Sequence, residues 1–114
     1  MADSTHSFSA YFKRAVSPIV TLAVLGEKPM YGYEISTVIR ERSGGQYTIS
    51  VMYPILYRLE EQGYIRIHHT EVVDGRVRNY YEITEAGRAY LDVTLREFEE
   101  NLISFRKLTG GIRE

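Results

Sequence analysis

The dipeptide Asp74-Gly75 is the feature that most constrains this chain, because it predicts a β-hairpin among patterns that are otherwise helical. Both residues suit the positive φ angles of a two-residue hairpin turn. The flanking stretches, "YIRIHHTEVV" and "RVRNYYEI", are rich in residues that strands favour. Side chains alternate along a strand, so Arg76 and Arg78 share one face of the return strand. The other face carries Val77, Asn79, Tyr81 and Ile83.

Helix signals begin well before the hairpin. Ser17 fits an N-cap, Pro18 the first helical position, and Gly26 the left-handed position just past a C-terminus. The preceding residues 7–16 are predicted to form either a separate helix or a kinked extension of the same one. Residues 31–45 form a second helix, which Gly44-Gly45 ends. Its apolar stripe is Ile35, Val38 and Ile39.

After a short β-prone link at residues 46–49, a third helix is predicted with Ser50 as its N-cap and Gly63 at its end. Proline is tolerated in a first turn, so Pro54 agrees with this start. One sector about 100° wide holds the apolar residues Met52, Ile55, Leu56 and Leu59, which we expect to be buried. The outward side begins without an acidic residue and carries Ser50, Tyr53, Pro54, Tyr57 and Arg58.

The last part of the chain predicts one long helix of about 24 residues with Thr84 as its N-cap. Its apolar residues repeat with the 4-3 spacing of a seam between helices, namely Leu91, Leu95, Phe98, Leu102 and Phe105. A chain this short cannot cover such a seam by itself, so we expect self-association. The predicted division is residues 1–83 for the first three helices and the hairpin, and 84–114 for a C-terminal dimerisation helix.

Composition limits the function classes. A chain of 114 residues can bury one core. The net charge is −1, with nine Lys/Arg against eight Asp/Glu in residues 1–81, so an anionic partner must meet a local patch. The absence of cysteine excludes disulfides and thiolate zinc sites. No apolar run approaches the roughly 20 residues of a membrane span and the N-terminus lacks a secretory signal, so we expect a cytoplasmic protein without a membrane partner.

The order of helix, helix, helix, ribbon and long helix describes a mainly α fold with a small β-hairpin: a winged helix-turn-helix plus a C-terminal helix. An α-helix fits the major groove of B-DNA, about 12 Å wide, and its N-terminal end favours phosphate. The outward residues of the third helix suit that role, and Arg76 and Arg78 would reach an adjacent minor groove or its phosphates. Residues 1–83 are therefore predicted to be an N-terminal helix and a winged helix-turn-helix DNA-binding domain. Tyr31 and Tyr33 could contact phosphate through their hydroxyls or could be half-buried packing residues. We expect phosphate contact for Tyr31 and packing for Tyr33.

Three segments carry a family resemblance: "KPMYGYEI" (28–35), "MYPILYRLEEQGYI" (52–65) and "RNYYEITEAGR" (78–88). In this order and spacing, across roughly residues 18–105, the chain resembles the PadR-like transcriptional regulators. The resemblance implies a homodimeric repressor of the short type, with the third helix as recognition helix and "DGR" as wing tip. The sequence departs from the family pattern at Val51-Met52 and at Tyr57, positions that affect base preference.

An effector site is a further hypothesis. Facing aromatic residues from two subunits would leave a space for a planar hydrophobic molecule, as the resemblance implies for some short members. The residues assigned to the dimer or this pocket are the seam residues above together with Phe8, Tyr11 and Phe12.

The same residues also bear on other functions. Adjacent strand residues point to opposite faces, so His68 and His69 should not converge on a metal, and we expect neither metal nor cofactor. Ser50, Glu60 and His69 form no recognisable catalytic arrangement, so an enzyme is not expected. The alternative function is a winged-helix module that binds another protein through its exposed tyrosines without binding DNA.

Overall fold

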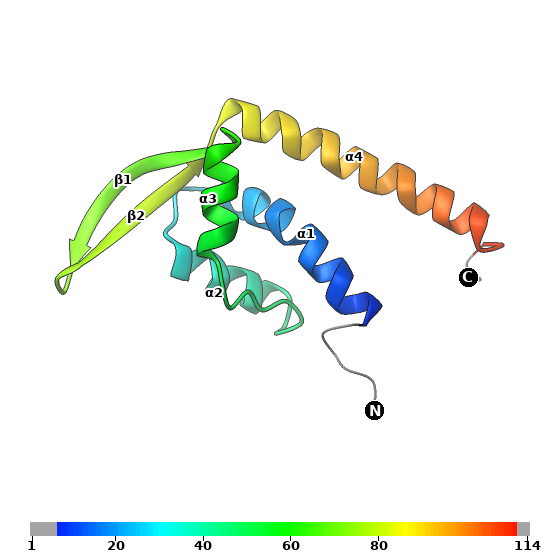
Figure 1. The fold of residues 1–114 in the computed structure, drawn as a ribbon, viewed down its shortest axis with the longest axis horizontal. Coiled ribbons are helices and arrows are strands. Elements are labelled where there is room, and N and C mark those ends of the chain that lie inside the picture. Colours follow the sequence, from blue (N-terminus) through cyan, green and yellow to red (C-terminus); the bar gives the residue numbers. More distant parts are fainter. Residues whose placement is uncertain (1–6, 112–114) are drawn as a thin grey trace.

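The computed structural model describes residues 7–111 as a mainly helical fold with one two-stranded antiparallel sheet (Figure 1). The elements in chain order are α1 (Phe8–Leu25), α2 (Gly32–Arg42), α3 (Tyr53–Glu61), β1 (Ile65–Val73), β2 (Arg76–Ile83) and α4 (Glu85–Leu108). The hairpin of β1 and β2 extends to one side of α3, and α4 extends to the other (Figure 1). This order confirms the predicted fold class.

α1 is a single helix of 18 residues that contains Pro18, so the predicted N-cap at Ser17 is wrong. The real N-cap is Ser7, whose hydroxyl accepts a hydrogen bond from the backbone N–H of Ala10 at 3.1 Å. A proline inside a helix costs about 3 kcal/mol. The burial of four side chains that follow the proline offsets this cost, because they reach the core only if the helix continues past Pro18. These side chains are Thr21, Leu22, Val24 and Leu25.

The end of α1 also differs from the sequence-based expectation. Gly26 has φ −65°, in the ordinary right-handed region and not the left-handed one. Its N–H donates to the carbonyl of Leu22 at 2.9 Å, so the helical turn simply runs on into the connector. By length and composition α1 could cross a membrane, with mean hydropathy 1.2, but the core of the domain covers its C-terminal half.

The core lies where α1, α2, α3 and the base of the hairpin meet. Its buried apolar side chains are Leu22, Val24, Leu25, Met30, Ile35, Ile39, Met52, Leu56, Leu59, Ile65, Tyr81 and Ile83. Close packing extends to the backbone at Gly32, where an added Cβ would lie 3.6 Å from Leu56 Cδ1. The start of α2 is therefore held directly against the start of α3.

α3 begins at Tyr53 with Met52 in the N-cap position, so the predicted cap at Ser50 is wrong. An N-cap carbonyl accepts the first helical hydrogen bond from the residue four positions later. For Ser50 that residue is Pro54, which has no N–H. For Met52 it is Leu56, whose N–H donates at 3.1 Å. Proline therefore sets the first residue of this helix.

The link before α3 is not a strand, although residues 46–49 are β-prone. Tyr47 and Ile49 are half-buried and pack against the core. Gly44 and Gly45, with φ of +61° and +83°, turn the chain out of α2 as predicted. Outside the hairpin, the β-type backbone pairing in residues 7–111 is an isolated bridge between Met30 and Tyr81. Residues 46–49 therefore have no strand to pair with.

The hairpin turn is the one predicted from the sequence. Asp74 and Gly75 have φ of 51° and 75°. Tyr81 and Ile83 are buried at its base, whereas Val77 is 64% exposed near its tip. One extra residue interrupts the pairing between Ile67 and His69. The ribbon is thus anchored at one end and free at the other.

α4 has the predicted cap and the predicted length. The hydroxyl of Thr84 accepts a hydrogen bond from the N–H of Gly87 at 3.0 Å, and the helix has 24 residues. Leu91 packs half-buried against the core. Beyond it Leu95, Phe98 and Phe105 are 48%, 42% and 51% exposed. The seam therefore lies open along most of this helix.

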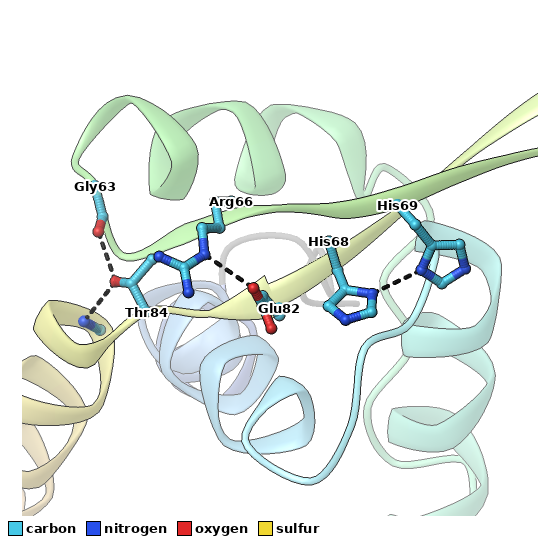
Figure 2. A network of polar contacts seen from close by, with 7 residues as sticks. Gly63, Arg66, His68, His69, Glu82 and Thr84 are labelled. Carbon is cyan, nitrogen blue, oxygen red and sulfur yellow. Dashed lines mark hydrogen bonds and ion pairs between the residues drawn. The ribbon is translucent and has the colours of Figure 1, made fainter.

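At the base of the hairpin, Arg66 Nε donates to Glu82 Oε2 at 2.9 Å (Figure 2). This hydrogen bond lowers the pKa of Glu82. The pair therefore stabilises the fold above the ordinary carboxyl pKa, and that contribution is lost as pH falls through the lowered value. We expect Arg66→Gln to raise the Glu82 pKa in an NMR titration, and Arg96→Gln on α4 to leave it unchanged. Equal Glu82 titration in all three proteins would contradict the assignment.

Candidate nucleic-acid interface

The outward face of α3 is formed by aromatic and polar side chains. Tyr53 and Tyr57 are 58% and 61% exposed, and their rings lie 6.1 Å apart. Pro54 and Arg58 are exposed beside them, and Ser50 is exposed just before the helix. The other side of the helix is buried through Leu56 and Leu59. The predicted outward residues of this helix are therefore all available to a partner.

The electrostatics of α3 favour an anion at its N-terminal end. Its first turn has no acidic residue, and Glu60 and Glu61 lie exposed in its last turn. Helix dipoles place partial positive charge at the N-terminus, worth about 0.3–1 kcal/mol toward an anion. Burial, followed by the nearby Glu60, raises the pKa of the Tyr81 phenol beneath the helix.

The hairpin of β1 and β2, called the wing below, lies next to this face and is connected to the start of α2 by ring contacts. The Arg78 guanidinium lies 4.6 Å from the Tyr31 ring centroid, a cation–π geometry. Tyr31 in turn lies 5.2 Å from Tyr80 of β2. Arg76 is exposed beside the turn. Tyr31 therefore holds one of the two wing arginines close to the start of α2.

A polar hollow lies between the wing and the starts of α2 and α3. Its lining brings together four of the predicted residues with three others, namely Tyr31, Tyr53, Arg76 and Arg78 with Tyr33, Val77 and Asn79. The other predicted residues of α3 and the link before it do not line the hollow, namely Ser50, Pro54, Tyr57 and Arg58. The site thus consists of a hollow and an adjoining helix face.

Tyr33 was expected to pack, and that expectation is wrong: its side chain is 68% exposed. Its ring lies 6.5 Å from that of Tyr31, on the rim of the hollow. Asn79 was assigned only to a strand face, yet it also lines the hollow and accepts a hydrogen bond from Thr70 at 3.0 Å. For Tyr33, the signal available in the sequence was its position two residues after Tyr31 at the start of a helix.

His68 and His69 do converge, contrary to the alternation argument. Their Nδ1 atoms are 2.7 Å apart (Figure 2). The interruption of pairing after Ile67 breaks the strict alternation of side chains on β1. His69 then stacks on Tyr80 at 4.3 Å and lies 2.9 Å from Glu71. Within residues 7–111, no three potential ligands come together as a metal site.

The residues predicted for a dimer or effector pocket are exposed or half-buried on α1 and α4. Phe8 and Tyr11 are 78% and 50% exposed. Phe12 links α1 to α4, with its ring 6.1 Å from that of Phe98. Leu102 is half-buried.

An apolar hollow lies between α1, the end of α2 and Leu95. The apolar part of its lining is Ile19, Val20, Ala23, Val24, Ile39 and Leu95. Of the residues predicted for the dimer or effector pocket, only Leu95 lines this hollow. Arg42 and Glu27, which also line this hollow, form a hydrogen-bonded ion pair. The hydrogen bond between them lowers the pKa of Glu27 and raises the pKa of Arg42.

The fold and this surface define a winged helix-turn-helix, and comparisons with known proteins agree. Residues 21–93 match the Transcriptional regulator PadR-like family. Transcriptional regulator Rv3488 of Mycobacterium tuberculosis is 34% identical over 100 residues, covering 88% of this chain and 89% of that protein. A transcriptional regulator from Clostridium thermocellum has TM-score 0.77 and 31% identity, over 85% of this chain and 96% of that chain.

A PadR family regulator from Eggerthella lenta has TM-score 0.78 with 23% identity, over 87% of this chain and 86% of that chain, and supports the fold. The matched residues span more than half of the sequence. The chain belongs to the PadR-like family of transcriptional regulators. This confirms the predicted family and the expectation that the protein is a regulator and not an enzyme, and DNA is the partner that such a function implies.

Proposed function

We propose that the protein is a homodimeric, sequence-specific repressor that binds a pseudo-palindromic operator in the cytoplasm. α3 lies in the major groove through Ser50, Tyr53, Pro54, Tyr57 and Arg58. Tyr31, Arg76 and Arg78 contact the adjacent backbone or minor groove. The observation that carries this proposal is the exposed, acid-free start of α3 beside the two wing arginines. A buried recognition surface would have excluded it.

The dimer is supported by the open seam on α4. Apolar seams of this spacing pack against a second helix, and in residues 7–111 no element covers Leu95, Phe98 and Phe105 fully. We assign residues 84–114 to dimerisation and residues 1–83 to DNA binding, as expected from the sequence. A two-fold axis would place two recognition helices about one helical turn of DNA, ~34 Å, apart.

Release by a planar hydrophobic effector is the third part of the proposal. Aromatic rings of Phe8, Tyr11, Phe12, Phe98 and Phe105 offer stacking area on the faces that would meet in a dimer. Such a ligand needs only a different affinity for two dimer geometries. We expect a flat aromatic dye to compete with operator duplex for the protein in fluorescence anisotropy.

The test of DNA binding is the salt dependence of affinity for random duplex. Binding through phosphate contacts releases counterions, so affinity should fall steeply as salt rises. Detectable binding to random duplex at low salt, measured by gel shift or anisotropy, is expected. Complete absence of binding there would favour the alternative, in which the exposed tyrosines bind another protein.

Tyr57 is expected to set base preference and not general affinity. Its ring projects from the middle of α3, away from the core. We predict that Tyr57→Ala changes discrimination among half-site variants by about 1–3 kcal/mol while affinity for random duplex stays nearly constant. Competition binding with single-base operator variants measures this. Val93→Ala, on the side of α4 opposite the seam, serves as the control, and an unchanged preference in Tyr57→Ala would remove Tyr57 from the groove.

A further inference from the structure

A compact joint connects the end of α3 to the start of α4. The Thr84 hydroxyl donates to the Gly63 carbonyl at 2.7 Å and accepts from the Gly87 N–H at 3.0 Å (Figure 2). The Thr84 N–H donates to the Tyr64 carbonyl at 2.9 Å. On the other side, the Tyr64 N–H donates to the carbonyl of Leu59 in α3 at 3.0 Å. An unbroken set of short hydrogen bonds therefore runs from one helix to the other.

Gly87 lets the two segments approach more closely than any other residue would allow. It is the only buried residue of α4. An added Cβ would lie 2.1 Å from the Tyr64 carbonyl oxygen and 2.8 Å from Ile83 Cγ1. Both distances are well below van der Waals contact, and one of the atoms is backbone, which cannot rotate aside. The direction of α4 therefore depends on the absence of a side chain here.

Two further contacts fix the rotation of α4 about the joint. The rings of Tyr64 and Tyr90 stack at 4.3 Å with an interplanar angle of 11°. Arg88 Nη2 donates to the carbonyl of Gly26 at the end of α1, at 3.4 Å. The start of α4 is thus held by Tyr64, just before β1, on one side and by the end of α1 on the other.

We propose that this joint, formed by Gly63, Tyr64, Thr84, Gly87 and Tyr90, positions the two recognition helices and so determines which half-site spacing the dimer accepts. The inference rests on the proposed dimer. α4 has 24 residues and is therefore about 36 Å long. A tilt of about 10° at the joint displaces its far end by roughly 6 Å, close to two base-pair steps of DNA at ~3.4 Å each.

The experiment measures binding of the full chain to duplexes that carry two copies of its half-site, with the centre-to-centre spacing varied one base pair at a time. A duplex with a single half-site measures the intrinsic contact. Gly87→Ala, Thr84→Val and Tyr90→Leu alter the joint. Ala86→Ser adds one atom at the exposed neighbouring position and is the control.

We expect the wild-type protein and Ala86→Ser to share one sharp spacing optimum. The joint variants should shift or broaden that optimum by one to two base pairs, with single-half-site affinity within about twofold of wild type. Folded variants, checked by circular dichroism, that keep the wild-type optimum would overturn the inference. Thr84→Val and Tyr90→Leu decide the matter if Gly87→Ala does not fold. A wild-type protein with no spacing preference would instead refute the proposed dimer, and the inference with it.

Discussion

Replacing Arg76 and Arg78 together by alanine should weaken binding to every duplex, by roughly tenfold or more at low salt. Both side chains lie on the wing beside the hollow, and Arg78 is held over the Tyr31 ring. Each phosphate contact contributes about 0.9 to the slope of log affinity against log salt. The double variant should therefore lose up to about two units of that slope, because sequence-independent contacts are removed while the α3 face stays intact.

The measurement is fluorescence anisotropy with operator and random duplex at several salt concentrations. Replacing Arg96 and Arg106 by alanine removes the same charge from α4 and serves as the matched control. An unchanged slope in the control would show that position matters and not net charge alone. Should the wing variant bind as tightly as wild type at every salt concentration, the wing has no role in binding.

Charging the open seam should give the other large effect. Phe98→Lys with Phe105→Lys places two ammonium groups where a second α4 is expected to pack, and a charge buried without a partner costs several kcal/mol. The chain should become monomeric. Operator affinity should then fall by a factor of about 100 or more, because linked binding of two half-sites raises affinity by 10²–10⁴.

Sedimentation velocity and operator titration measure the two consequences separately. Val93→Lys with Ser104→Lys adds the same charge on the opposite side of α4 and should leave the dimer intact. A seam variant that stays dimeric and binds the operator normally would show that α4 does not form the interface.

Sequence signals predicted the structural features that depend only on neighbouring residues. The Asp74-Gly75 turn needs only its own φ angles, and the Thr84 cap needs only the N–H three residues on. Both features are present as expected. The same kind of reasoning failed at Ser50, where a good capping residue lies four positions before a proline that cannot donate the first helical bond.

Features that depend on the packing of distant segments were not predictable in this way. Pro18 lies inside α1 because the helix must reach the core, which no local rule describes. His68 and His69 converge because one residue of β1 is unpaired, and an interruption of this kind depends on how the whole ribbon fits the domain. Gly87 carries no periodic signal, yet the Tyr64 carbonyl lies against it.

Selection from a pool of random duplexes by the purified 114-residue chain tests the central proposal most directly, because it examines DNA binding, base preference and two-fold symmetry together. We predict an enriched sequence with two inverted half-sites ~34 Å apart, one for each copy of α3. A pool that stays random after several rounds at low salt, or that yields one unrepeated half-site, would contradict a dimer that reads DNA through this helix.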